Sequence, residues 1–520
     1  MQGKTTHDRV GGDIDVGTNR IRKVVVAGGG TAGWIAASTL AYQLKEQLEV
    51  TLVESAQIAT VGVGEATVPP IRNYHRFMNI DEQEFLRAVA GAFKLSISFE
   101  NFVRPGHRYI HPFGITGKGT LVAGFEQFWL DSVRRGMKSE LHEYSLEAMA
   151  SLDDRFAIVD DPKINYAYHM DAALYVKFLR EKFQPYGIRQ VEGKINEVRQ
   201  NPDSGHVEAL VLEDGQVIEG DFFIDCTGFR GLLIEQTLKT GYEDWNHWLP
   251  CDRAIAVQTR SVDPSPVPYT RAIAHQAGWR WHIPVQHRVG CGLVYDSRYM
   301  SDDEAQAKLM HDVGAEPVRD PWQVRFRTGR RLKAWNKNVV ALGLASGFIE
   351  PLESTSIHLA MSAVMKLVEL FPSEGIPDSL VNLYNDSCRR ELEHVRDFIV
   401  LHYHANQREE KMWTDCREMK LPDSLQLRID AWRDRAYAWY EPGELFATTS
   451  WIHVLLGQGI FPKQHHPLPR ELSDADLRSL LASIRGPIDR TIPKLPSQQA
   501  FIDRYCKAPP GVWNMHRPAA

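Results

Sequence analysis

The chain has 520 residues, of which 43% are hydrophobic and 24% are charged, and its formal net charge is −6 at pH 7. These values are typical of a globular protein with more than one module, and they exclude a fibrous or wholly disordered chain. The net charge is negative, and no stripe of lysine or arginine residues offers a basic surface for a nucleic-acid backbone. No nucleic-acid partner is therefore expected.

Cysteine usage and hydropathy restrict the class further. The six cysteines are scattered without CxxC pairs, so we expect reduced thiols in a cytoplasmic protein and no metal site. The first twenty residues lack the apolar core of a signal peptide, and no uncharged apolar run reaches membrane-spanning length. We therefore expect no membrane association, with residues 1–21 as a disordered lead-in.

Regular structure is predicted to begin with a strand, a tight turn and a helix. The β-branched run at 22–27 ends in a Gly-x-Gly-x-x-Gly turn, an apolar helix follows, and a second strand at 50–54 completes a βαβ unit with a parallel sheet. Such glycines let a pyrophosphate approach the helix N-terminus, and an acid that ends the second strand can accept hydrogen bonds from ribose. The predicted dinucleotide contacts are Gly28, Gly30, Thr31, Ala32, Gly33 and Glu54.

Three further glycine-punctuated segments could line the same cofactor. The run 61–70 closely follows the ribose-contacting strand, although its pattern fits a flexible loop equally well, and two buried strands end at Asp225 and near Leu342. Several distant segments suit FAD, a long cofactor, better than NAD. The predicted flavin-side contacts are Val63, Gly64, Glu65, Ala66, Gly343 and Leu344.

Residues 92–99 alternate apolar with smaller or polar residues, which predicts a half-buried strand with Lys94 on its polar face. A solvated lysine is the ordinary interpretation of this pattern. A functional interpretation requires an ammonium inside a pocket, where it can donate hydrogen bonds to a reactive species. The nearby segment 111–113 could simply be a turn with a packed aromatic ring.

Two later segments also allow both a structural and a functional interpretation. Residues 279–284 alternate aromatic and polar side chains before a proline, which predicts an edge strand whose tryptophans fill the core. Residues 350–356 offer two acids followed by hydroxyl groups before a helix at 357–371. They are either a helix N-cap or an anion site.

The C-terminal part is predicted to be helical. Long helical patterns include 383–404 and a segment opened by a capping box at 473–476, and Pro/Gly-rich breaks at 374–377, 441–443 and 485–487 separate them. A β-hairpin with an Asp-Gly turn is predicted at 207–218. We therefore expect an FAD-binding α/β domain with substrate-facing β-rich insertions at 22–371 and a helical substrate-capping module at 372–520.

Together, these motifs resemble the flavin-dependent tryptophan halogenase family from about residue 22 to 470. The segments that carry the resemblance are GGGTAGW at 28–34, GVGEATVP at 62–69, the Lys94 strand, WRWHIP at 279–284 and GFIEPLEST at 347–355. The resemblance implies a Rossmann-like α/β FAD domain of the glutathione-reductase and aromatic-hydroxylase type, with a mostly helical C-terminal module. It also implies FAD supplied as FADH2 by a separate flavin reductase, a halide ion, a small aromatic substrate, and a homodimer as a further expectation.

The resemblance implies a division of labour in which hypohalous acid, formed beside the flavin, travels to the substrate. Lys94 would present the electrophilic halogen, and Glu353 would stabilise the cationic arene or accept its proton. Thr355 and Ser356 would hold halide, although the family usually has glycine at position 356.

The substrate is expected to be indole or an indole derivative. His111 and Phe113 match a pair that contacts the indole ring in the family. The stretch with which tryptophan-specific members grip the amino acid has only a loose counterpart at 437–444, which disfavours free tryptophan. A flavin monooxygenase that hydroxylates its substrate and a non-catalytic FAD-binding redox protein are the alternatives.

Overall fold

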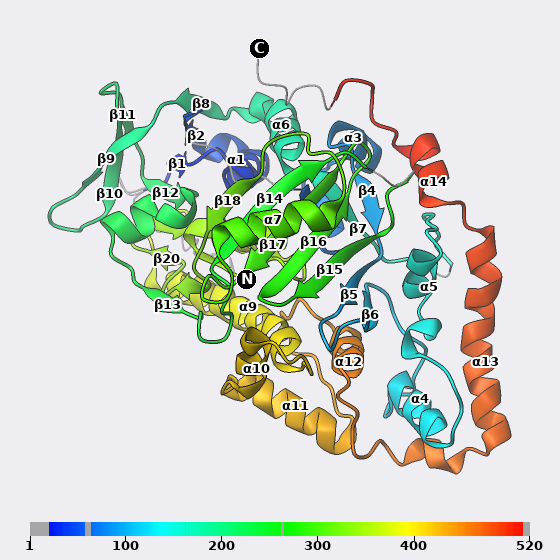
Figure 1. Cartoon of the computed structure of the whole chain (residues 1–520). Coiled ribbons are helices and arrows are strands. Elements are labelled where there is room, and N and C mark those ends of the chain that lie inside the picture. The colour runs from blue at the N-terminus through cyan, green and yellow to red at the C-terminus, as the bar shows by residue number, and fades with distance from the viewer. Residues whose placement is uncertain (1–19, 58–63, 162, 262–264, 513–520) are drawn as a thin grey trace, which may run out of the picture.

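The computed structural model describes residues 20–57, 64–161, 163–261 and 265–512 (Figure 1). Val63 and residues 1–19 of the predicted lead-in lie outside the described residues. Arg20 and Ile21, which we assigned to that lead-in, belong to the fold: Arg20 forms a β-bridge with Glu374, and Ile21 is buried in the main core.

A six-stranded sheet forms the nucleotide-binding centre of the molecule. Its order is β20-β21-β12-β1-β2-β8, with every neighbouring pair parallel except β20 and β21. The strands are β1 (Lys23–Ala27), β2 (Glu49–Glu54), β8 (Arg189–Glu192), β12 (Phe222–Asp225), β20 (Trp335–Asn336) and β21 (Val339–Ala341). The predicted parallel βαβ unit is confirmed, and the three predicted cofactor strands β1, β12 and β21 are neighbours.

A second, seven-stranded sheet has the order β18-β14-β17-β16-β15-β5-β6. Its strands are β5 (Ser96–Glu100), β6 (Arg108–Pro112), β14 (Arg253–Thr259), β15 (Tyr269–His275), β16 (Gly278–Pro284), β17 (Val289–Tyr295) and β18 (Trp322–Arg325). The edge assignment for 279–284 was wrong, because β16 lies between β15 and β17. Its terminal Pro284 is tolerated because it is the last residue of the strand, and both tryptophans are buried in the core, as expected.

The prediction of a single half-buried strand at 92–99 was also wrong. The segment forms two strands in different sheets, β4 (Ala92–Lys94) and β5, and all of residues 92–99 are buried. A three-stranded sheet holds β4 beside β7 (Ala167–Asp171), which also pairs with β3 (Gly64–Ala66). The alternation of apolar and polar residues led to a wrong prediction because both faces of this segment pack against protein. Its polar residues therefore lie in the interior.

Two small sheets complete the β-structure. One contains the predicted hairpin, and its strands are β9 (Ile195–Gln200), β10 (Val207–Leu212) and β11 (Val217–Glu219). The other consists of β13 (Tyr242–Asp244), β19 (Gly329–Arg331) and β22 (Gly347–Phe348).

Helices cover the sheets and dominate the chain after residue 372, along the lower and right-hand edges of Figure 1. The earlier helices are α1 (Thr31–Leu44), α2 (Ile71–Phe77), α3 (Glu82–Ala88), α4 (Phe125–Arg134), α5 (Leu146–Leu152), α6 (Ala172–Phe183), α7 (Asp302–Val313) and α8 (Ser356–Glu369). The later ones are α9 (Asp378–His404), α10 (Lys411–Glu418), α11 (Asp423–Arg435), α12 (Thr448–Gly457), α13 (Asp474–Thr491) and α14 (Gln498–Tyr505). Ser473 caps α13 as predicted, but the break at 485–487 was wrong, because α13 continues through Pro487.

The C-terminal helices share their cores with the sheets. Tyr384 of α9 and Phe501 of α14 belong to the same core as β1 and α1, whereas residues 395–403 of α9 pack with β5 and β16. All six cysteines are free thiols. Within the described part of the chain, no helix is both long and apolar enough to cross a membrane.

Candidate active site

The predicted glycine turn connects β1 to α1. Gly30 is the N-cap of α1, and Thr31 and Ala32 form its first turn. A Cβ at Gly33 would lie 1.8 Å from the carbonyl oxygen of Gly28, so this position requires glycine for the helix to approach the strand. The turn thus leaves the N-terminus of α1 facing the carboxyl end of the parallel sheet, where a pyrophosphate fits.

Glu54 ends β2 beside this turn. Its Oε1 accepts hydrogen bonds from Gln190 and from Arg180 Nη2 at 3.1 Å, and its Oε2 lies 3.5 Å from Trp34 Nε1. These contacts hold the carboxylate next to α1, where ribose hydroxyls could reach it. Arg180 and Gln190 could not be predicted from local patterns, because both lie more than a hundred residues further along the chain.

The other predicted cofactor segments converge on the same helix. A Cβ at Gly28 would lie 2.4 Å from the carbonyl oxygen of Cys226, and one at Gly343 would lie 2.6 Å from Cβ of Ala32. Leu344 belongs to the short 3-10 helix that starts at Gly343. Three separate segments therefore leave a cradle without side chains at the start of α1, which fits a bound dinucleotide. Gly64, Glu65 and Ala66 form β3, in the same small sheet as the Lys94 strand.

Lys94 is completely buried and lies in a polar cage. Its Nζ donates hydrogen bonds to the carbonyl oxygen of Thr67 at 3.0 Å and to Oγ of Ser354 at 2.8 Å, and it lies 4.8 Å from the ring centre of Phe113. Burial lowers the pKa of Lys94 to about 7, although the negative charge of Glu353 opposes this shift. Near neutral pH the side chain therefore exists partly as a free amine, which can react with an electrophile.

Glu353 is the second buried charge of the site. Its Oε2 lies 2.9 Å from Nδ1 of His111, and its Oε1 lies 3.0 Å from Nε2 of His402. Burial alone would raise the pKa of Glu353, but its interactions with the two histidines lower that pKa to about 2. The carboxylate is therefore ionised across the working pH range.

His402 is a member of this cluster that sequence reasoning missed. Burial lowers its pKa, although Glu353 opposes this shift; its Nδ1 lies 2.7 Å from the hydroxyl oxygen of Tyr109, and its Nε2 lies 3.0 Å from Oε1 of Glu353. His402 lies inside the long helix α9, where one histidine among helical residues carries no local signal of a site.

Residues 353–356 place successive side chains in different surroundings. Ser354 adopts a positive φ of 62°, which is unusual for a residue other than glycine. Glu353 consequently faces the histidines while Ser354 contacts Lys94. Thr355 is buried, and its Oγ1 has no hydrogen-bond partner in the described part of the protein; Ser356 begins α8. A free hydroxyl beside a helix N-terminus fits a halide ion.

A second buried acid, Glu350, joins the WRWHIP strand to this segment. Its Oε2 accepts hydrogen bonds from Nε1 of Trp279 at 2.7 Å and from the hydroxyl of Tyr403 at 2.8 Å. Burial raises the pKa of Glu350 to about 7, against the effect of these hydrogen bonds. The sequence suggested core packing for Trp279 but did not indicate this partner.

A cavity of about 300 Å³ lies between α8, α9 and the loop before α12. Pro70 on its wall is three residues beyond Thr67, and Leu445 precedes Phe446, whose ring centre lies 6.3 Å from that of His111. The remaining wall residues, from α8, α9 and the loop before α12, are His358, Ser362, Lys366, Ser387, Arg390, Glu391, His394, Pro442, Gly443 and Glu444.

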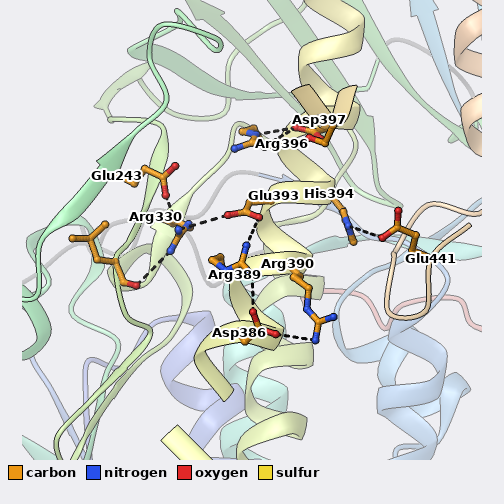
Figure 2. A network of polar contacts seen from close by, with 12 residues as sticks. Glu243, Arg330, Asp386, Arg389, Arg390, Glu393, His394, Arg396, Asp397 and Glu441 are labelled. Carbon is orange, nitrogen blue, oxygen red and sulfur yellow. Dashed lines mark hydrogen bonds and ion pairs between the residues drawn. The ribbon is translucent and has the colours of Figure 1, made fainter. Parts of the chain in front are cut away.

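Ion pairs anchor the helix α9 that forms one wall of this cavity, as Figure 2 shows. Arg330 of β19 contacts Glu243 at 2.6 Å and Glu393 of α9 at 3.6 Å. On the opposite side, His394 lies 3.8 Å from Glu441 in the loop before α12. The helix is thus tied both to the small β-sheet and to that loop.

One group of side chains among the described residues could hold a metal ion, namely His394, Glu441 and Glu444. Arg428 pairs with both of these acids and already supplies the positive charge that an ion would bring. The group is therefore an ion-pair cluster in this structure.

Comparison with known proteins gives a consistent result. The family model for tryptophan halogenases matches residues 23–474. The tryptophan 6-halogenase SttH of Streptomyces toxytricini is 34% identical over 520 aligned residues, which cover 92% of this chain and 97% of that protein. A flavin-dependent halogenase from Xanthomonas campestris aligns with a TM-score of 0.93 and 47% identity, over 94% of this chain and 99% of that one. The flavin-dependent halogenase BrvH from Brevundimonas sp. BAL3 aligns with a TM-score of 0.90 and 39% identity over the same shares.

Proposed function

Because this chain belongs to the tryptophan halogenase family and is therefore a flavin-dependent halogenase, we propose that it places bromide or chloride on indole or an indole derivative, using Lys94 and Glu353. The observation that carries the proposal is that Glu353 and Ser354, adjacent in the chain, bind the histidine pair and Lys94 respectively. The two groups that halogenation of an arene requires, a halogen carrier and an anion, thus lie in one buried cluster.

Reduced FAD, when bound with halide and O2, supplies hypohalous acid. We assign the turn at 28–33 and Glu54 to FAD, and we assign Thr355 and Ser356 to halide on the basis of the unpartnered Oγ1 of Thr355. A separate flavin reductase would provide the reduced cofactor.

Lys94 holds the electrophilic halogen against the arene. Its lowered pKa supports this role, because the free amine can bond to halogen and the ammonium can donate a hydrogen bond to hypohalous acid. The hydrogen bonds to Thr67 and Ser354 fix the position of Nζ. Both acceptors are neutral, so neither binds the ammonium as a carboxylate would.

Glu353 stabilises the positive charge that develops on the ring during halogen transfer. A buried anion fixed by two histidines needs no reorganisation when that charge appears, which makes it an effective electrostatic catalyst. The proton that leaves the ring carbon can pass to this carboxylate.

The substrate is proposed to lie beside His111 and Phe113, with any polar arm extending into the 300 Å³ cavity. Phe446 and Phe398 extend the aromatic surroundings of His111, with their ring centres 3.8 Å apart. The charged cavity wall suits an indole derivative with a polar substituent as well as indole itself.

The test is a reaction of the purified protein with FAD, a flavin reductase, NADH, O2, bromide and indole, followed by mass spectrometry. Bromoindole is the expected product, and its formation should require bromide. Hydroxyindole as the main product would favour the monooxygenase alternative. No halogenated product across a panel of indoles and phenols, with flavin turnover intact, would refute the substrate class.

A further inference from the structure

A second cavity, of about 510 Å³, lies among the C-terminal helices outside the active-site cluster. It is bounded by the end of α9 at His404, by Arg417 of α10, by Arg433 of α11 and by Gln458 after α12. None of the residues of the halogenation cluster lines it. Its volume is within the range of small-molecule sites.

The lining of this cavity is strongly positive. Arg417, Arg433 and Lys463 all line it, and no aspartate or glutamate is among its described lining residues. Lys463 pairs with Asp434 at its outer edge, 3.0 Å away. Neither arginine has a carboxylate within ion-pair distance in the parts of the chain that the structure describes, although Arg417 donates to the carbonyl oxygen of Arg408 at 2.8 Å.

Gln458 forms a buried part of the cavity wall. Gln458 is only 3% exposed, and its Oε1 has no hydrogen-bond partner among the described residues. Its Nε2 donates to the carbonyl oxygen of His402 at 3.0 Å, which fixes the orientation of the amide. This bond ties the cavity wall to α9.

An exposed aromatic residue stands at the rim. Phe461 is 58% exposed and lines the cavity three residues beyond Gln458. An aromatic ring beside polar groups can stack on the apolar face of a sugar, while arginines bind phosphate through paired N–H groups. A phosphate also carries nearly two negative charges at neutral pH, which suits two arginines that lack a carboxylate partner better than the single charge of a carboxylate does.

We propose that this cavity is a binding site for a small hydroxylated organic phosphate, such as a sugar phosphate. Arg417 and Arg433 bind the phosphate, and Phe461 covers the sugar. The site is separate from the halogenation site, but Gln458 connects the two through the backbone of His402, whose side chain contacts Glu353.

The proposal can be tested by titrating the FAD-saturated protein with ribose 5-phosphate by calorimetry at fixed bromide concentration and ionic strength. Saturating FAD fills the dinucleotide site, which would otherwise bind ribose and phosphate. The test variant is Arg433→Glu, on the exposed face of α11. Arg435→Glu is the matched control, because Arg435 is an exposed arginine of the same helix outside the cavity.

We expect saturable binding that Arg433→Glu weakens at least about tenfold and that Arg435→Glu changes less than about twofold. Gluconate, which has hydroxyl groups but a single carboxylate, should bind more weakly than ribose 5-phosphate. The proposal is overturned by an absence of saturable binding, by equal binding in the wild type and Arg433→Glu, or by gluconate binding as tightly as the phosphate.

Discussion

Nζ of Lys94 donates a 2.8 Å hydrogen bond to Oγ of Ser354, the residue that directly follows Glu353. The bond joins two segments that are 260 residues apart in the chain. It links the proposed halogen-carrying amine to the residue next to the proposed charge-stabilising acid. The backbone turn at 353–354 is therefore one of the features that set the geometry of the site.

Replacing Lys94 should separate flavin chemistry from halogen transfer. Lys94→Ala removes the proposed halogen carrier, so ring halogenation should fall by about a thousandfold or more, whereas oxidation of reduced flavin should continue. The two rates can be measured together by product mass spectrometry and flavin absorbance. Full halogenation by the variant would refute the assignment, and Lys494→Ala, a change at an exposed lysine outside the cluster and the cavity, provides a control for general disturbance.

Lys94 should also affect stability in a pH-dependent way. Its pKa in the folded protein, about 7, lies below its ordinary value of 10.5, so between these values the unfolded chain binds more protons. The wild type should therefore gain stability relative to Lys94→Met by about 1.4 kcal/mol for each pH unit above 7. Denaturant unfolding of both proteins from pH 6 to 9 measures this difference, and a difference that stays constant would contradict the lowered pKa.

Glu353→Gln keeps the shape of the side chain but removes its charge. Because the proposed role is electrostatic, halogenation should slow by about a hundredfold to a thousandfold, with little change in substrate affinity. Single-turnover measurements with saturating indole separate the two effects. Since the pKa of Glu353 is about 2, the wild-type rate should show no titration of this group above pH 4.

Position 356 should control the halide. Ser356→Gly restores the residue usual in the family and changes the first residue of α8, so we expect a changed ratio of bromination to chlorination with indole. Thr355→Val, which removes the unpartnered hydroxyl, should weaken apparent halide affinity about tenfold. Both effects can be measured by halide titrations at constant ionic strength. If neither variant changes the titration, the proposal that this segment binds halide is refuted.

Much of the nucleotide-binding fold could be predicted from local patterns, because its elements are contiguous: the Gly-x-Gly-x-x-Gly turn, Glu54 and three buried strands. The errors arose where tertiary packing overrides the pattern. Residues 92–99 alternate like a half-exposed strand, yet protein covers both faces. The prediction of a helix break at 485–487 was wrong because α13 accommodates Pro487, which is exposed to solvent.

The site itself was only partly predictable. Lys94 and Glu353 were assigned by resemblance, since composition and spacing alone favoured a solvated lysine and a helix cap. His402, one of the two histidines that lower the pKa of Glu353, lies on an element distant in sequence and has no motif of its own. The proximity of these groups exists only after β4, α8 and α9 have packed together.

The positive φ of Ser354 has a consequence for engineering this protein. Because one turn orients Glu353, Ser354 and Thr355 at once, an insertion or deletion there would displace acid, lysine contact and halide hydroxyl together. Changes in substrate range should therefore be sought elsewhere, in the loop at 442–445 and on the α8 and α9 faces of the 300 Å³ cavity. Libraries that vary those walls and preserve 353–356 would retain the chemistry while changing which arene receives the halogen.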